Sequence, residues 1–367
     1  MIDLRRFVTG MVALHLAAIL FLPCRVQGIS AETAIVVDAT TGRVLFEKHS
    51  DKRSLIASTT KIMTALIVCE QCNVLDRVRI PKAATGIEGS SMYLQEGEIM
   101  TVQELLYGLM LSSGNDAAVA LAIYCGGTVE GFVQLMNDKA RALGMQSTHF
   151  ENPHGLDGQQ HYSTASDMAL LASYAMNNPI FAKTVSTKTV QAAGRSLRNH
   201  NKLLWLFKDA DGVKTGFTKA AGRILVSSAM RQGRRLVAVT MNAPDDWNDH
   251  SKMLTDGFSG YQISEILSKG DCVGTAEVVG GEFCSVELIS AEEFIYPLAD
   301  SEKTSIVVTG SGFVYAPIAC GQAAGTAYVC VDGKPVGKVE LVYGATVEQT
   351  KPIKRSFWHR WLRGIDG

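Results

Sequence analysis

The sequence predicts an α+β protein: an antiparallel sheet packed with helices, then a small all-β domain and a C-terminal amphipathic helix. Three observations support this prediction. β-Rich runs occur near the start of the globular chain and return after residue 210. Residues 58–174, between them, have mainly helical patterning. From about residue 268 the chain has short β-branched runs separated by Gly and Asp turns, which is typical of a separate β domain.

The length and composition agree with two globular domains. The chain has 367 residues, of which 47% are hydrophobic and 19% are charged. The formal net charge is −1. This balance lacks the basic excess of nucleic-acid-binding domains, so we expect no nucleic-acid partner.

Residues 1–28 have the layout of a secretory signal peptide. Arg5 and Arg6 precede an apolar run, and small residues suitable for cleavage follow it. A transmembrane anchor is the alternative. The run is interrupted by Thr9 and His15, which makes it marginal for spanning a membrane. We therefore expect an exported protein.

A first domain is predicted over residues 29–265. "AIVVDATTGRVLFEKH" reads as two strands around a turn at Thr40–Gly42. Strands are expected again in "DGVKTGFT", "GRILVSSAM" and "RRLVAVTMNA", the last two separated by the turn "RQG". The early hairpin and the late strands should pair in one sheet, with the intervening helices packed around it.

A small β-rich domain is predicted over residues 266–345, where Asp332-Gly333 is a hairpin signal. The tail, residues 346–367, has apolar and basic side chains at helical spacing, which predicts a helix lying on a membrane surface. The alternative is a short helix docked on the second domain. These side chains are Phe357, Trp358, Trp361 and Leu362 beside Lys354, Arg355, Arg360 and Arg363.

The first candidate for chemistry is Ser58 with Lys61, at the start of an apolar helical run. Residues at i and i+3 share a helix face, and burial lowers a lysine pKa toward neutrality. A neutral amine beside a hydroxyl can take its proton, which activates serine as a nucleophile. The alternative is a helix-capping Ser58 with Lys61 as a surface charge.

The second candidate is Ser113-Gly114-Asn115, in a break between two apolar helices. Ser113 could relay a proton, and the Asn115 amide could bind a substrate carbonyl. The alternative is a capping box made by Ser113 and Asp116.

The third candidate is Lys214-Thr215-Gly216, in a predicted strand. Lys214 and Thr215 could bind a carboxylate with a cation and a hydroxyl. Gly216 would let another backbone, such as that of an extended peptide, approach closely. The alternative is an exposed edge strand protected by its lysine.

Together and in this order, the three motifs resemble those of the active-site-serine penicillin-binding proteins and class A β-lactamases. The S-G-N form of the second motif is similar to low-molecular-mass penicillin-binding proteins, the serine-type D-alanyl-D-alanine carboxypeptidases of peptidase family S11. So are "NPHGLDGQQHYSTASDMALLA", "NHNKLL" and the opening hairpin. The resemblance covers residues 34–258 and extends more loosely through the β domain to the tail.

The resemblance implies the serine β-lactamase/DD-peptidase fold and removal of the terminal D-alanine from peptidoglycan stem pentapeptides. Ser58 would be the nucleophile and Lys61 the general base, while Ser113 and Lys214 would carry the proton to the leaving amine. Asn115 would orient the acyl-enzyme, and Lys214, Thr215 and Gly216 would line the substrate site. The backbone N–H groups of Ser58 and Phe217 would form the oxyanion hole.

The resemblance further implies that β-lactams acylate Ser58 and that the enzyme works at the outer face of the cytoplasmic membrane. No cofactor is expected. No metal site is expected either, because His149, His154, His161 and His200 lack ligand spacing such as H-E-x-x-H.

One departure from the family pattern concerns the substrate carboxylate. Many relatives have an arginine where this chain has Asp246. Arg198 or Lys202 could substitute for it.

Three other functions remain as alternatives. A D-alanyl endopeptidase would use the same chemistry. A serine β-lactamase would need a glutamate base for deacylation, and no E-x-x-L-N-type segment lies between the second and third motifs. A non-catalytic cell-wall-binding protein would keep the fold without the activity.

Overall fold

The computed structural model describes residues 28–350 of the chain, so residues 1–27 of the predicted signal peptide and residues 351–367 of the predicted tail lie outside the described residues. The chain divides into two compact units between Gly260 and Tyr261. The boundary expected after residue 265 therefore falls inside strand β10 (Gln262–Leu267), which pairs with a strand of the second unit. Each unit is described by itself.

A five-stranded antiparallel sheet forms the frame of the first unit, in the order β2-β1-β9-β8-β7. The early hairpin thus pairs with the late strands, as predicted, through the β1–β9 ladder. The strands are β1 (Thr33–Asp38), β2 (Val44–Lys48), β7 (Ala210–Thr218), β8 (Gly222–Arg231) and β9 (Arg234–Met241).

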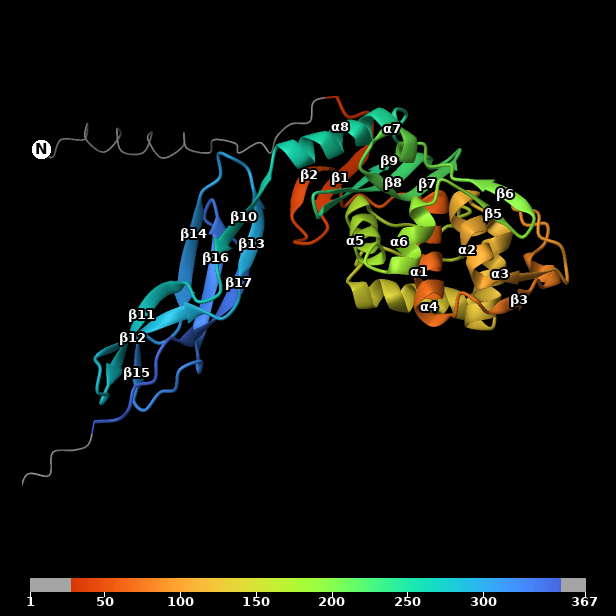
Figure 1. Ribbon diagram of the computed structural model, residues 1–367. Helices are drawn as coiled ribbons and strands as arrows, with labels where there is room; N and C mark the ends of the chain where they lie inside the picture. Colours follow the sequence, from red (N-terminus) through yellow and green to blue (C-terminus); the bar gives the residue numbers. More distant parts are fainter. Residues whose placement is uncertain (1–27, 351–367) are drawn as a thin grey trace, which may run out of the picture. The chain divides into compact units, whose positions relative to one another are not determined.

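Helices cover both faces of this sheet. Figure 1 shows α8 on one side and α1, α5 and α6 on the other. The helices are α1 (Lys61–Gln71), α2 (Val102–Leu111), α3 (Asn115–Gly126), α4 (Val129–Leu143), α5 (Ala165–Ala175), α6 (Pro179–Ser186), α7 (Leu203–Leu206) and α8 (Asp246–Ser259).

Helix α1 lies in the centre of the helical layer. Every residue from Lys61 to Cys69 is buried, which agrees with its nearly all-apolar sequence. Its neighbours α2, α3, α4, α5 and α6 all pack against it. Helix α1 therefore cannot shift without disturbing the main core, and this holds its N-terminal end in place.

Short elements complete the first unit. Two 3₁₀ turns, η1 (Ala57–Thr60) and η2 (Lys82–Ala84), flank α1 and the loop that follows it. Strand β3 (Arg77–Arg79) pairs with β4 (Ile99–Thr101), and β5 (Thr189–Ala192) pairs with β6 (Arg195–Arg198).

The second unit is built from strands in its described residues, as predicted. Six strands form one sheet in the order β14-β16-β17-β12-β11-β15, and β10 pairs with β13. The Asp332-Gly333 turn joins β16 to β17. The strands are β11 (Cys272–Val279), β12 (Ser285–Ser290), β13 (Phe294–Leu298), β14 (Thr304–Thr309), β15 (Phe313–Tyr315), β16 (Ala323–Val331) and β17 (Lys334–Tyr343).

Over residues 28–350, no single helix combines the length and apolar composition of a membrane span. Helices α3 and α4 meet those criteria only as a pair bent by 84°.

Candidate active site

Ser58 lies in the 3₁₀ turn η1, immediately before α1. The turn is closed by its own hydroxyls, because Thr59 Oγ1 donates to Ile56 O at 2.5 Å and Thr60 Oγ1 donates to Ala57 O at 2.8 Å. Ser58 caps neither η1 nor α1, whose N-cap residues are Ile56 and Thr60. The capping alternative for Ser58 is therefore wrong.

Lys61 is fully buried, so the surface-charge alternative is also wrong. Its Nζ lies 3.1 Å from Ser58 Oγ, 2.7 Å from Asn115 Oδ1 and 2.6 Å from the backbone oxygen of His154. Burial first, and the nearby Lys214 second, hold the pKa of Lys61 well below its usual value. In the neutral amine, two N–H groups can bond to Asn115 and His154, which leaves the lone pair for the Ser58 proton.

Ser113 and Asn115 lie at the junction between α2 and α3, as the sequence predicts. Asn115 begins α3 and is held on both sides, because its Nδ2 donates to Glu88 O at 2.5 Å and its backbone N–H donates to Ser90 O at 2.7 Å. The N-cap residue of α3 is Gly114, which makes no side-chain cap, so the proposed capping box of Ser113 is absent. Ser113 instead lines the pocket described below.

The third motif lies on β7, next to η1. Lys214 is 1% exposed, and burial lowers its pKa to about 7. A Cβ on Gly216 would lie 3.2 Å from Ile56 O and 3.3 Å from the backbone nitrogen of Ser58. The close approach that Gly216 permits is therefore that of the turn carrying Ser58, which corrects our expectation that the glycine makes room for a peptide.

A pocket of about 330 Å³ opens beside these residues. Five of the predicted residues lie on its wall: Ser58, Ser113, Thr215, Gly216 and Phe217. The other three, Lys61, Asn115 and Lys214, are buried residues of the same three segments. The structure thus brings together side chains that are up to 159 positions apart in the sequence, from Ser58 to Phe217.

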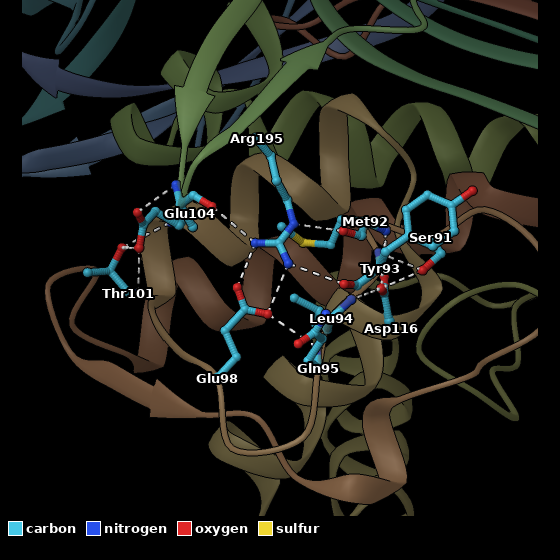
Figure 2. A network of polar contacts seen from close by, with 11 residues as sticks. Ser91, Met92, Tyr93, Leu94, Gln95, Glu98, Thr101, Glu104, Asp116 and Arg195 are labelled. Atoms are coloured by element: carbon cyan, nitrogen blue, oxygen red, sulfur yellow. Dashed lines mark hydrogen bonds and ion pairs between the residues drawn. The ribbon is translucent and has the colours of Figure 1, made fainter.

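One side of the site is closed by the loop between η2 and β4, residues 85–98, which we call the 85–98 loop. Asp116 is 1% exposed and holds this loop from α3. Its carboxylate accepts from Met92 N at 3.1 Å, Leu94 N at 3.0 Å and Ser91 Oγ at 2.6 Å, as Figure 2 shows. Ser90, next to these residues, lines the pocket.

Arg195, from the β5–β6 hairpin, holds the same loop from the opposite direction. In Figure 2 its guanidinium reaches the backbone oxygens of Met92 at 2.9 Å and Tyr93 at 3.2 Å. It also forms two hydrogen bonds to the Glu98 carboxylate, at 2.6 and 2.9 Å. The 85–98 loop is therefore fastened by one acidic and one basic side chain from different elements.

His161 is a buried residue whose structural role the sequence did not reveal. It lies 2.7 Å from Thr60 Oγ1 beneath η1, and burial lowers its pKa to about 4. A neutral ring there supports the turn that carries Ser58. Among the described residues, no group of His, Cys, Asp or Glu side chains is arranged to hold a metal ion.

The pocket wall also includes Asp246, the residue at which many relatives have an arginine. Asp246 is the first residue of α8, lies on the pocket wall and pairs with Arg223 of β8. Of the two residues suggested as substitutes for the missing arginine, Lys202 lines the pocket. Arg198 instead lies over the Trp205 ring, 5.2 Å from its centroid. Sequence reasoning did not find Arg223, because no motif includes it.

Comparison with known proteins identifies the family of the chain. Residues 23–245 match the family model of D-alanyl-D-alanine carboxypeptidases, and residues 261–349 match that of the C-terminal domain of penicillin-binding protein 5. The chain is 35% identical over 320 residues to the D-alanyl-D-alanine carboxypeptidase DacF of Bacillus subtilis, covering 83% of this chain and 82% of that protein. It is 33% identical over 342 residues to DacC of Escherichia coli, covering 88% and 85%.

Solved structures give the same result. Penicillin-binding protein 5 of Haemophilus influenzae superposes with a TM-score of 0.75 at 30% identity, covering 88% of this chain and 98% of that one. The DacD carboxypeptidase of Francisella tularensis also gives a TM-score of 0.75, at 27% identity, covering 93% and 99%. The match spans the α+β unit and the all-β unit together. The chain therefore belongs to the D-alanyl-D-alanine carboxypeptidase family of serine hydrolases.

Proposed function

We propose that this protein removes the terminal D-alanine from peptidoglycan stem pentapeptides through an acyl-enzyme on Ser58. The observation that carries the proposal is the buried Lys61, whose Nζ lies 3.1 Å from Ser58 Oγ at the wall of the pocket. A lysine kept neutral by burial can accept the serine proton at physiological pH.

In the first half of the reaction, Ser58 Oγ attacks the carbonyl carbon between the two D-alanines as its proton moves to Lys61 Nζ. The backbone N–H groups of Ser58 and Phe217 stabilise the oxyanion. The C–N bond then breaks, and Ser113 and Lys214 pass the proton to the leaving amine of D-alanine. Thr215 binds the carboxylate of that residue.

In the second half, water attacks the ester on Ser58 and restores the hydroxyl, leaving a shortened stem peptide. Asn115 supports this step by holding the base in place, because its Oδ1 accepts a hydrogen bond from Lys61 Nζ at 2.7 Å. A β-lactam is an amide that mimics the D-alanyl dipeptide, so it should acylate the same serine.

The proposal includes export, with the enzyme at the outer face of the cytoplasmic membrane and the basic tail bound to the membrane surface. The sequence patterns of residues 1–28 and 346–367 support this location. The substrate, the peptidoglycan stem peptide, is found on that side of the membrane.

The test is to incubate the purified protein with a fluorescent penicillin, map the adduct by peptide mass spectrometry, and measure D-alanine release from a peptide ending in D-Ala-D-Ala. We expect a covalent adduct on Ser58 and the release of one D-alanine from each peptide that is cleaved. Ser58→Ala should lose both. Turnover of the penicillin without D-alanine release would indicate a β-lactamase. Absence of both an adduct and turnover would indicate a non-catalytic wall-binding protein.

A further inference from the structure

Arg223 and Asp246 form an ion pair on the pocket wall, next to the third motif. Arg223 Nη2 donates to both carboxylate oxygens of Asp246, at 2.7 and 2.9 Å. The Asp246 side chain is 3% exposed, whereas that of Arg223 is 42% exposed. The acid therefore lies beneath, and part of the guanidinium reaches the pocket surface.

The guanidinium of Arg223 is held from two directions but is not saturated. Asp246 uses only its Nη2 atom, and the Trp247 ring lies beside it with its centroid 5.5 Å away. The Nε donor of Arg223 is buried and has no hydrogen-bond partner within residues 28–350. Nε itself is too buried to meet a ligand, but the side chain is 42% exposed and its bonds to Asp246 use Nη2 alone, so the exposed part of this fixed guanidinium is suited to binding an anion.

The β7–β8 register places Arg223 within reach of Thr215. Arg223 is directly opposite Phe217, so the two side chains share a face of the sheet. Thr215 is two residues before Phe217 and therefore shares that face as well. Side chains at such diagonal positions are about 7–8 Å apart at their bases, a gap that a carboxylate can bridge between a hydroxyl and a long arginine.

The other basic groups of the site are poorly suited to binding a carboxylate at neutral pH. Burial lowers the pKa of Lys214 to about 7 and that of Lys61 well below its usual value, so neither is a dependable cation there. An arginine remains charged throughout this range. Lys202 also lines the pocket, but it is an exposed, flexible side chain without the planar fork of arginine.

We propose that Arg223, positioned by Asp246 and Trp247, binds the terminal carboxylate of the substrate together with Thr215. This inference rests on the proposed carboxypeptidase function. Arg223 takes the role that many relatives give to an arginine at the position of Asp246. In this chain the cation lies on β8, and Asp246 on α8 orients it.

The test compares a peptide ending in D-Ala-D-Ala with its C-terminal amide, using the full-length protein. The main variant is Arg223→Gln/Asp246→Asn, which removes both charges and leaves no unpaired buried carboxylate. Its kcat/KM should fall about 10- to 100-fold for the acid peptide, the effect of a charge-assisted hydrogen bond, and hardly change for the amide. Lys202→Gln is the matched control and should keep the preference for the acid.

Asp246→Asn alone tests the positioning role. It keeps the cation and loosens its orientation, so KM for the acid peptide should rise while kcat stays near the wild-type value. The proposal is overturned if the double variant keeps the wild-type preference for the acid over the amide. It is also overturned if Lys202→Gln, and not the double variant, loses that preference.

A second comparison separates this inference from the proposed function. Penicillins also carry a carboxylate, so the rate of Ser58 acylation can be measured with a penicillin and with its methyl ester. The double variant should slow acylation by the acid about 10- to 100-fold and leave the ester rate unchanged. If the wild type releases no D-alanine, the carboxypeptidase function fails, yet this comparison still supports or overturns the role of Arg223.

Discussion

At the scale of a single residue, burying the Lys214 side chain at the site lowers the stability of the folded state. Its side chain is buried, and burial lowers its pKa to about 7. In the unfolded chain a lysine has a pKa near 10.4. Between about pH 7 and pH 10.4 the unfolded state therefore holds a proton that the folded state lacks, so stability rises with pH over this range.

We therefore predict that Lys214→Met stabilises the first unit at pH 6 by about 2–5 kcal/mol, because each unit of pKa depression costs about 1.4 kcal/mol. The gain should shrink as the pH rises and vanish near pH 10.4. Thermal unfolding of the full chain at pH 6, 8 and 10 measures it. The same variant should lose D-alanine release, since it removes the proposed proton carrier.

The matched control for this prediction is Lys219→Met, in the exposed turn between β7 and β8. It should change neither the stability nor its pH dependence. Equal or lower stability of Lys214→Met at pH 6 would contradict the prediction.

Two residues of the site illustrate what sequence reasoning can see. Ser58 and Lys61 became candidates through their spacing at the start of an apolar helical run, because i and i+3 neighbours meet whenever a helical turn forms. Their catalytic interpretation came from the three motifs together. The burial of Lys61 could only be inferred, since it depends on His154 and Asn115, which come from loops and helices far along the chain.

At the scale of elements, the site depends on how separate segments are fastened together. The 85–98 loop has little regular structure of its own and is held by Asp116 of α3 and Arg195 of β6 (Figure 2). Asn115 donates hydrogen bonds to the backbone oxygens of Glu88 and Ser90 in this loop and accepts one from Lys61. The position of the loop is therefore linked to that of Lys61.

We predict that Arg195→Met loosens the 85–98 loop without unfolding the unit. Loss of its charge-assisted bonds should cost about 1–3 kcal/mol of stability. Amide hydrogen exchange at residues 90–95 should increase, and the rate of penicillin acylation should decrease. Hydrogen-exchange mass spectrometry and acylation kinetics measure the two effects.

Arg141→Met is the control, because Arg141 pairs with Asp138 on the exposed surface of α4. It should change stability by less than about 1 kcal/mol. Unchanged exchange at residues 90–95 in Arg195→Met would mean that Asp116 alone holds the loop.

The elements themselves were largely predictable. The hairpin of β1 and β2, the strands β7 to β9 and the β16–β17 turn follow from β-rich runs and turn residues, and all are confirmed. The interpretation of Gly216 was wrong because periodicity shows that a close approach is possible and does not show which segment makes it.

At the scale of the whole molecule, the tail is the remaining prediction. A chain that ends at Thr350 keeps every described residue and loses the basic, aromatic segment 351–367. We predict that the mature form of this truncated protein no longer sediments with vesicles containing anionic lipid, while its penicillin acylation is unchanged. The full mature chain should bind these vesicles less well as salt is raised.

Replacing Lys354 and Arg355 by glutamine gives a finer control. Weaker binding in that variant would show that charge contributes alongside the aromatic side chains. Full binding of the truncated protein would contradict the prediction and place the membrane contact elsewhere in the chain.

The sequence by itself determined the order of helices and strands, the β character of the second unit and the three motifs. All of these are patterns of side-chain type among residues that are close together in the chain, so they can be recognised in the sequence without the structure. Only the tertiary structure decided that Lys61 and Lys214 are buried, that Gly216 packs against the Ser58 turn and that Arg223 joins Asp246 in the pocket. Burial and ion pairing depend on which distant segments meet, so a pair separated by 23 positions on a strand and a helix leaves no periodic signal.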